Sequence, residues 1–271
     1  MKPEFSPGEL AQAAAICADL LAGRSDQGIQ ALRALQDEIY AAIPDKQRIS
    51  RGITWVLQRV SLLLAQTCQD DGEILALGQI LAGALSHSDR LYGAPVFLMA
   101  EYGKRHPAEV FDFFEQTAQS DDWVVREFAA AGFHKLIGPN REVALPFLQR
   151  AARAPQPNLR RFASETLRPV TDNRWLLKQP EYSLSVLRLL FREAHPYPRT
   201  SVGNNLSDLS RRQSELIYAI VAELVASGDS NSYWIAHRAC RNLVKQDPLR
   251  VMDALGVDEY HYKDRNFYRS P

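Results

Sequence analysis

One short pattern returns four times in the second half of this chain of 271 residues, and it limits the fold more than any other feature does. The pattern occupies residues 126–131, 160–165, 200–205 and 237–242, at intervals of 34, 40 and 37 residues. A unit of that length accommodates a pair of helices, whose apolar face only the next pair can cover. We therefore predict an α-solenoid, with the four segments on the second helix of successive pairs.

Apolar residues recur at steps of three and four along most of the chain, and strand patterns are nearly absent. This periodicity predicts helices at Pro7–Leu21, Ile29–Ile43, Ile49–Leu64 and Ile74–Leu85, separated by short polar or Pro/Gly breaks. Short connections make neighbouring helices antiparallel. The expected fold class is all-α: a right-handed α-solenoid of HEAT-like antiparallel helix pairs with a concave groove.

The formal net charge of zero is the sum of opposed parts. Residues 1–125 carry 10 basic and 17 acidic side chains, whereas residues 126–212 carry 15 and 7. Such asymmetry suggests a polyanion-binding face in the middle of the chain, although helical proteins also carry basic solvated faces. We expect one repeat domain over 1–271: acidic helical pairs at 1–119, the later repeats at 120–256, and a C-terminal tail at 257–271.

Cysteine usage and hydropathy point to the cytoplasm. The three cysteines are far apart and form no CxxC or Cys/His cluster, so neither a metal site nor a disulfide framework is expected. No signal peptide is evident, and the longest apolar runs fall far short of the roughly 20 residues of a membrane span. We expect a cytoplasmic protein, a monomer with no cofactor and no membrane contact.

Polar residues in four segments could carry chemistry, and each has an ordinary alternative. Asp121 and Asp122 precede a helix, so they could act as acids or simply cap it. Arg161, Glu165 and Arg168 share a helix face, where they could form a surface ion-pair ladder. Alternatively, the two arginines at the helix start, Arg160 and Arg161, could hold phosphate together with the flanked acid Glu165. The third and fourth segments contribute the residues Ser201, Asn204, Asn205 and Asp208, and then Arg238, Arg241 and Lys245.

The third segment places poor helix formers in the middle of a helix, which marks either a functional site or an asparagine ladder between adjacent repeats. The fourth places its three cations on one stripe beside Trp234 and His237, which suits a phosphate backbone or a solvated basic face. Trp123 is expected in the core or in a groove wall.

Three strings, in order, resemble the DNA alkylation-repair HEAT-like family, nearer its AlkC branch than its AlkD branch. They are LRRFASETLRP, SVGNNLSDLS and YWIAHRACRNLVKQ, and the resemblance covers about residues 120–256. The AlkC pattern runs approximately RRLxSEGxRPRLPW, SVANNLND and WxxKHALRxLLKQ. The chain departs from it where PRLPW becomes PVTDNRW and KHALR becomes HRACR.

The resemblance implies a monofunctional DNA glycosylase that removes N-alkylated purines, chiefly 3-methyladenine, from double-stranded DNA without a cofactor. By position, it implies that Glu165, Asp208 and Asp122 are the acids, with Glu127 as a second candidate for the first. It places Trp175 near the motif tryptophan. DNA contacts are then expected from Arg126, Arg160, Arg161, Asn205, Arg238, Arg241, Lys245 and Trp175.

These residue types suit the chemistry. A purine alkylated at N3 is cationic and already a good leaving group, so the protein has mainly to stabilise the oxocarbenium-like sugar and to position a water. Carboxylates can do both, and Trp175 could offer a π face to the cationic base. Two alternatives remain: a non-catalytic relative that binds DNA structures, and a HEAT-type protein-interaction scaffold.

Overall fold

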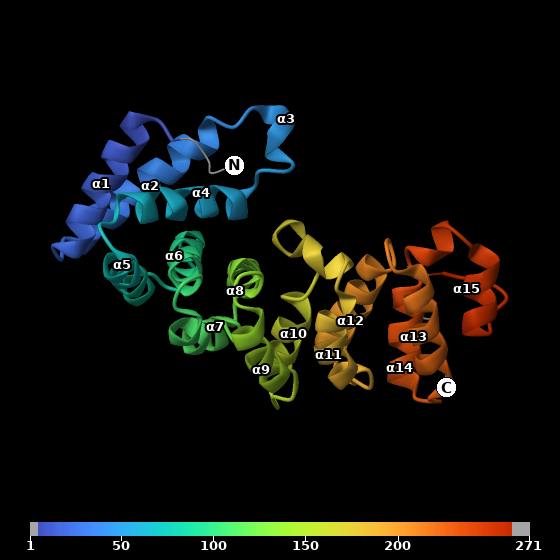
Figure 1. Cartoon of the computed structure of the whole chain (residues 1–271). Helices are drawn as coiled ribbons and strands as arrows, with labels where there is room; N and C mark the ends of the chain where they lie inside the picture. Colours follow the sequence, from blue (N-terminus) through green and yellow to red (C-terminus); the bar gives the residue numbers. More distant parts are fainter. Residues whose placement is uncertain (1–4, 262–271) are drawn as a thin grey trace. The chain divides into compact units, whose positions relative to one another are not determined.

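The computed structural model of the protein describes residues 5–261, and within that range it contains helices and turns but no β-strand (Figure 1). The chain divides into two compact units, Met1–Asn140 and Arg141–Pro271. The α-helices of the first unit are α1 (Pro7–Leu21), α2 (Ser25–Ala41), α3 (Asp45–Arg48), α4 (Ile53–Thr67), α5 (Asp71–Ala84), α6 (Gly93–Gly103), α7 (Phe111–Thr117) and α8 (Trp123–Ile137). Those of the second unit are α9 (Arg141–Ala152), α10 (Pro157–Glu165), α11 (Pro180–Leu187), α12 (Pro196–Leu209), α13 (Ser214–Ala226), α14 (Ser230–Ala239) and α15 (Pro248–Leu255).

Short 3-10 turns lie between several of these helices. They are η1 (Arg90–Tyr92), η2 (Pro107–Val110), η3 (Thr171–Leu177), η4 (Arg188–Leu190) and η5 (Leu243–Lys245). Of these, η3 follows α10 and contains Trp175, the predicted stacking residue.

Local sequence explains where the helices begin and end. Helix α1 has the predicted bounds because Ser6 and Glu9 form a capping box and Pro7 occupies the first helical position. The predicted helix from Ile49 is wrong at its start. Gly52, a poor helix former, ends the preceding turn, and α4 begins only at Ile53. Ile49 therefore lies outside the helical stripe and is 97% exposed.

In each unit three helices pack side by side in a row, and other helices of the same unit pack against that row. In the first unit α4, α6 and α8 pack in sequence, with α5 against α6 and α7 against α8. In the second unit α10, α12 and α14 pack in sequence, with α9 against α10 and α13 against α14. The four repeated segments begin in α8, α10, α12 and α14, as predicted. The all-α solenoid class is confirmed.

Packing within the row of the second unit follows the predicted apolar stripes. Phe162 in α10 and Leu206 in α12 are buried. Helices α12 and α14 approach so closely that a Cβ on Gly203 would lie 2.8 Å from the Cβ of Arg238, so the glycine is required by space alone. Trp123 was expected in the core or in a groove wall; it is 63% exposed at the start of α8, so the first of these two expectations is wrong.

No helix among residues 5–261 is both long enough and apolar enough to cross a lipid bilayer.

Candidate functional site

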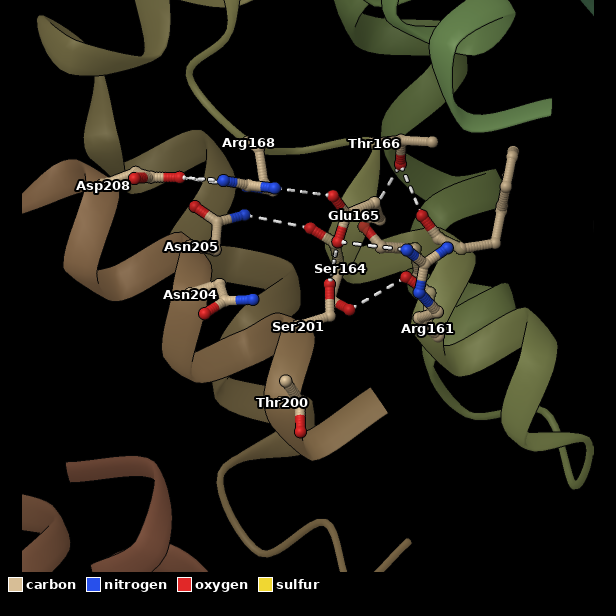
Figure 2. A network of polar contacts seen from close by, with 12 residues as sticks. Arg161, Ser164, Glu165, Thr166, Arg168, Thr200, Ser201, Asn204, Asn205 and Asp208 are labelled. Atoms are coloured by element: carbon tan, nitrogen blue, oxygen red, sulfur yellow. Dashed lines mark hydrogen bonds and ion pairs between the residues drawn. The ribbon is translucent and has the colours of Figure 1, made fainter. Parts of the chain in front are cut away.

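The last residue of α10, Glu165, is a buried carboxylate held by three neighbouring side chains (Figure 2). Its Oε1 accepts a hydrogen bond from Arg168 Nη1 at 2.9 Å, and its Oε2 accepts one from Ser201 Oγ at 2.6 Å. Arg161 Nη2 lies 3.7 Å from the same Oε2. Burial acts to raise the pKa of Glu165, but the charges of Arg161 and Arg168 outweigh it and the pKa is lowered. The carboxylate is therefore ionised at neutral pH.

Asp208, in the last turn of α12, is joined to Glu165 through one shared arginine. Arg168 donates from both Nε and Nη2 to Asp208 Oδ2, at 2.9 and 2.6 Å. Arg211 Nη2 lies 3.4 Å from the other oxygen, Oδ1. Both carboxylates are only 8% exposed, so Arg168 compensates two negative charges that water reaches poorly. Burial acts to lower the pKa of Arg168, yet Glu165 and Asp208 raise it, so this guanidinium stays charged.

Amide side chains fix the register of the helices that carry these acids. Asn205 Nδ2 donates to the carbonyl oxygen of Ser164 at 2.9 Å, from α12 to α10 (Figure 2). Asn242 Nδ2 repeats the contact one helix later, donating to the carbonyl of Ser207 at 2.8 Å. The asparagine ladder between repeats is therefore present. Asn205 is fully buried, so the expected contact of its side chain with DNA is not supported by its position.

A pocket opens beside Asp208. Its volume is about 380 Å³, and its lining consists of Arg168, Pro169, Val170, Arg174, Leu177, Asp208 and Arg211. Three guanidinium groups and one carboxylate give this lining a positive net charge. A bound phosphate or other anion therefore matches the charge of the open part of the pocket better than a bound cation does. Asp208 is the acid that this pocket exposes to a bound molecule.

Arginines expected to contact DNA instead make repeated structural contacts. Arg160 Nη1 donates to the carbonyls of Ala154 and Pro155, six and five residues earlier, at 2.9 and 2.7 Å. Its Nε and Nη2 bind the Glu193 carboxylate at 2.6 and 3.1 Å. Because these contacts engage the whole guanidinium, Arg160 holds α10 to the turn before it and to the start of α12.

Arg126 makes the same contact one repeat earlier, in the first unit. Its Nη1 donates to the carbonyls of Ser120 and Asp121, again six and five residues before it, at 2.6 and 2.9 Å. The shared geometry of Arg126 and Arg160 gives the sequence repeat a physical basis. Neither guanidinium is positioned mainly for DNA.

Asp122 is the N-cap of α8. Its Oδ1 accepts from the backbone N–H of Val124 at 2.8 Å, and its Oδ2 accepts from Arg90 Nη1 at 3.0 Å. Asp122 belongs to the first unit, whereas Glu165 and Asp208 belong to the second. The cap accounts for Oδ1 and the ion pair with Arg90 for Oδ2, and a catalytic role of Asp122 stays a prediction. The second candidate, Glu127, is half-buried in α8 of the same unit.

Trp175, in η3, is covered on one face. The Arg141 guanidinium carbon lies 3.8 Å from its ring centroid, and the ring of Tyr182 packs edge-on at 5.1 Å. The indole N–H donates to Asn173 Oδ1 at 3.3 Å. A cation therefore lies over one face of the ring, and a cationic base could stack on that face only after Arg141 moves.

The cations of α14 and its C-terminal turn form the predicted stripe. Arg238 Nε and Arg241 Nη1 both donate to Asn204 Oδ1, at 2.9 and 3.3 Å, and Lys245 Nζ reaches Asn242 Oδ1 at 3.4 Å. Lys245 is exposed, and the two arginines are half-buried. Arg161 is nearly buried over the ring of Tyr197, at 4.6 Å, so it supports Glu165 from inside the helix row.

Sequence reasoning placed Arg168 on the face of Glu165 but gave it no role in the site, and it overlooked Arg174 and Arg211. Arg168 has a local sequence signal of an ion pair, because it follows the acid Glu165 by three residues and directly precedes Pro169. Arg211 follows Asp208 by the same spacing, beyond the end of α12. Among residues 5–261, no group of three or more His, Cys, Asp or Glu side chains could hold a metal ion.

Neither a protein-family model nor a curated protein matches the sequence. Solved structures do match its fold. AlkD2 from Streptococcus mutans superposes with a TM-score of 0.59 at 19% sequence identity, over 78% of this chain and 97% of that one. The smu.31 protein from Streptococcus mutans UA159 gives 0.54 at 19% identity, over 70% and 98%.

The alkylpurine DNA glycosylase AlkC from Pseudomonas fluorescens, bound to DNA containing an abasic site analog, gives a TM-score of 0.56 at 19% identity. The match covers 91% of this chain, which spans 66% of the AlkC chain. The expected resemblance to the AlkC and AlkD proteins is therefore confirmed at the level of the fold.

Proposed function

We propose that this protein is a DNA-repair glycosylase that hydrolyses the N-glycosidic bond of N-alkylated, cationic purines such as 3-methyladenine in double-stranded DNA. The observation that carries the proposal is the pair of buried carboxylates, Glu165 and Asp208, on adjacent helices and bridged by Arg168. Asp208 and Arg168 line a pocket in a helical array whose fold is shared with an alkylpurine DNA glycosylase captured on DNA.

The protein has little need to donate a proton to the leaving base, because the alkylated base already carries a positive charge and leaves as a neutral purine. Positive charge then develops on the sugar. The Asp208 carboxylate, at the pocket, stabilises that charge and accepts a proton from the attacking water. In this hydrolysis the C1′–N bond breaks, the base leaves with the bonding electron pair, and the water oxygen forms a C1′–O bond.

Glu165 is farther from the opening and acts through Arg168. Its low pKa keeps it ionised, so it is a permanent counter-charge and does not serve as a general acid at neutral pH. Because Arg168 is shared, Glu165 also sets how much of the Asp208 charge remains available to the sugar. We treat Glu165 as a positioning residue and Asp208 as the catalytic one.

DNA contact is assigned to the cations at the pocket and on the stripe of α14. These are Arg174, Arg211 and Lys245, which are exposed, and Arg238 and Arg241, which are half-buried. Phosphate contacts of this kind make affinity fall steeply with salt. We place the DNA partner on this surface of the second unit, and we assign Arg126 and Arg160 to structural contacts.

A second candidate, a non-catalytic protein that binds DNA structures, is favoured by two observations. Arginines neutralise both acids, and Arg141 covers one face of Trp175. Such an arrangement could bind DNA through the same cations and perform no chemistry.

The test is release of free base from DNA treated with a methylating agent, followed by chromatography, with abasic sites scored by alkaline strand cleavage. We expect wild type to release 3-methyladenine and Asp208→Asn to lose activity by about 100-fold or more. The matched control is Asp253→Asn, an exposed aspartate of α15 in the same unit, which should keep full activity. Salt-dependent DNA binding without release by wild type would support the second candidate, and absence of binding would exclude both.

A further inference from the structure

The first unit contains one basic segment in an otherwise acidic stretch of chain. Residues 40–59, here called the α3 segment, carry Lys46, Arg48, Arg51 and Arg59 against the single acid Asp45. The other residues of 1–125 carry 6 basic and 16 acidic side chains. Positive potential in this region is therefore concentrated on the α3 segment.

The segment also exposes an apolar side chain at its tip. Helix α3 has only four residues and stands at the end of the α2–α4 pair (Figure 1). Ile49, directly after it, is 97% exposed, the highest value among the large exposed apolar residues of the described chain. Lys46 and Arg48 precede it and Arg51 follows it. A single exposed isoleucine is ordinary on a protein surface, but here it stands among three cations within six residues.

Aromatic rings hold the arginines of the segment in place. The guanidinium of Arg51 lies 4.9 Å from the centroid of Trp55, and that of Arg59 lies 4.6 Å from the centroid of Phe5. Arg48 lies 5.4 Å from the ring of Tyr40. Arg59 also binds Glu9 at 2.9 Å, and Arg48 pairs at 3.0 Å with Asp45, whose side chain is 89% exposed. Stacking on Trp55 fixes the planar guanidinium of Arg51, which reduces the ordering required when phosphate binds.

We propose that the α3 segment is a second DNA-binding site, in which Lys46, Arg48 and Arg51 bind backbone phosphates while Ile49 inserts between base pairs from the minor groove. The chemistry is that of an apolar wedge flanked by cations, which separates stacked bases and kinks a duplex. This inference rests on the proposed DNA substrate and gives the first unit a role that the carboxylate site does not supply.

Anionic lipid headgroups would also bind these cations, but the exposed apolar surface of the α3 segment is too small for membrane attachment. Membrane attachment grows with the apolar area that enters the headgroup region, and usually uses one face of a long amphipathic helix. The α3 segment offers one fully exposed isoleucine, Ile49, directly after a four-residue helix that is too short to form such a face. A wedge needs only one side chain between two base pairs, so the segment is suited to duplex DNA.

The test uses the full chain and a duplex that carries 2-aminopurine at successive positions, whose fluorescence rises when the base is unstacked. We expect wild type to raise the fluorescence at a particular step, and Ile49→Ala to abolish the rise while weakening binding several-fold. The matched control is Leu249→Ala, because Leu249 is 76% exposed on α15 and has no predicted DNA role. Both residues are exposed, so neither variant should disturb folding.

A second measurement addresses the cations. The double variant Lys46→Ala with Arg51→Ala should lower the slope of log affinity against log salt by about two, since each lost phosphate contact removes roughly 0.9. An unchanged slope would overturn the phosphate assignment. Unstacking that persists in Ile49→Ala would overturn the wedge, as would binding of wild type to phosphatidylserine vesicles in preference to duplex DNA.

The failure of this inference can be separated from the failure of the proposed function. Base release by wild type with no effect of Ile49→Ala would contradict only the wedge. Ile49-dependent unstacking without any base release would contradict only the glycosylase.

Discussion

Replacing Arg168 by methionine probes the energetics of the candidate site most sharply. The guanidinium makes three charge-assisted hydrogen bonds, at 2.9 Å to Glu165 and at 2.9 and 2.6 Å to Asp208. Methionine keeps much of the side-chain length and apolar volume but none of the donors. The variant therefore leaves two carboxylates, each 8% exposed, without their common counter-charge.

The size of the stability loss follows from the charges that remain after the substitution. Breaking a buried ion pair on one side costs about 3–5 kcal/mol, because the surviving charge stays poorly hydrated. The Arg168 side chain is itself 28% exposed, so some water reaches the site, and we expect a loss near the lower end, about 3 kcal/mol at pH 7. The matched control is Arg188→Met, whose surface pair with Glu223 at 2.8 Å should contribute less than about 1 kcal/mol.

The loss should also depend on pH in a defined direction. In wild type the pKa of Glu165 is below its ordinary 4.5, so its stabilising contribution is present above that pH and disappears as pH falls through the lower folded value. Without Arg168, the pKa of Glu165 rises from its wild-type value, because burial is then opposed only by Arg161 and Ser201, so the variant gains less stability from ionised Glu165 as pH rises. The difference between wild type and Arg168→Met is thus largest at neutral pH and shrinks in acid.

Urea unfolding followed by circular dichroism at pH 7 and near pH 4 measures both quantities. The reasoning is refuted if Arg168→Met loses no more stability than Arg188→Met, or if its loss is the same at both pH values. Adding Glu165→Gln and Asp208→Asn to Arg168→Met should recover part of the stability, because the uncompensated charges are then gone.

Three smaller predictions concern packing and the aromatic face. Asn205→Leu leaves a buried carbonyl of α10 without its donor and should lower the free energy of unfolding by about 1–3 kcal/mol in urea titrations; a change below about 0.5 would deny the ladder a structural role. Gly203→Ala places a Cβ 2.8 Å from the Cβ of Arg238 and should cost about 1–3 kcal/mol by the same method, so a neutral result would show that α12 and α14 can separate freely. Arg141→Ala should uncover Trp175, seen as stronger iodide quenching of tryptophan fluorescence, and equal quenching would mean that the ring is not shielded by the guanidinium.

The fold was largely predictable because its determinants are local and periodic. Ser6, Pro7 and Glu9 set the start of α1 without reference to any distant residue. The repeat that begins at Arg126 and Arg160 is apparent in the sequence. In the structure both arginines bind the carbonyls six and five residues before them. The start of α4 was missed because apolar spacing alone cannot show that Gly52 interrupts the helix.

The candidate site was less predictable, because the contacts that join its two helices connect residues more than 30 positions apart. The sequence places Glu165 and Asp208 on successive repeats, but their bridge through Arg168 depends on how two helices align. Asp122 and Arg160 show the opposite difficulty: the residue types suit catalysis and DNA binding, while the geometry assigns them to a helix cap and to a turn. Part of the predicted tail, residues 262–271, lies outside the described residues.

The most direct test of the account is the single-turnover rate of base release from methylated duplex DNA by wild type and Asp208→Asn, with DNA affinity measured on the same preparations. We predict that the rate constant falls by about 100- to 1000-fold while affinity changes little, because the carboxylate acts on charge that develops only in the transition state. Equal rates for the two proteins, or no release by wild type that binds DNA normally, would contradict the glycosylase.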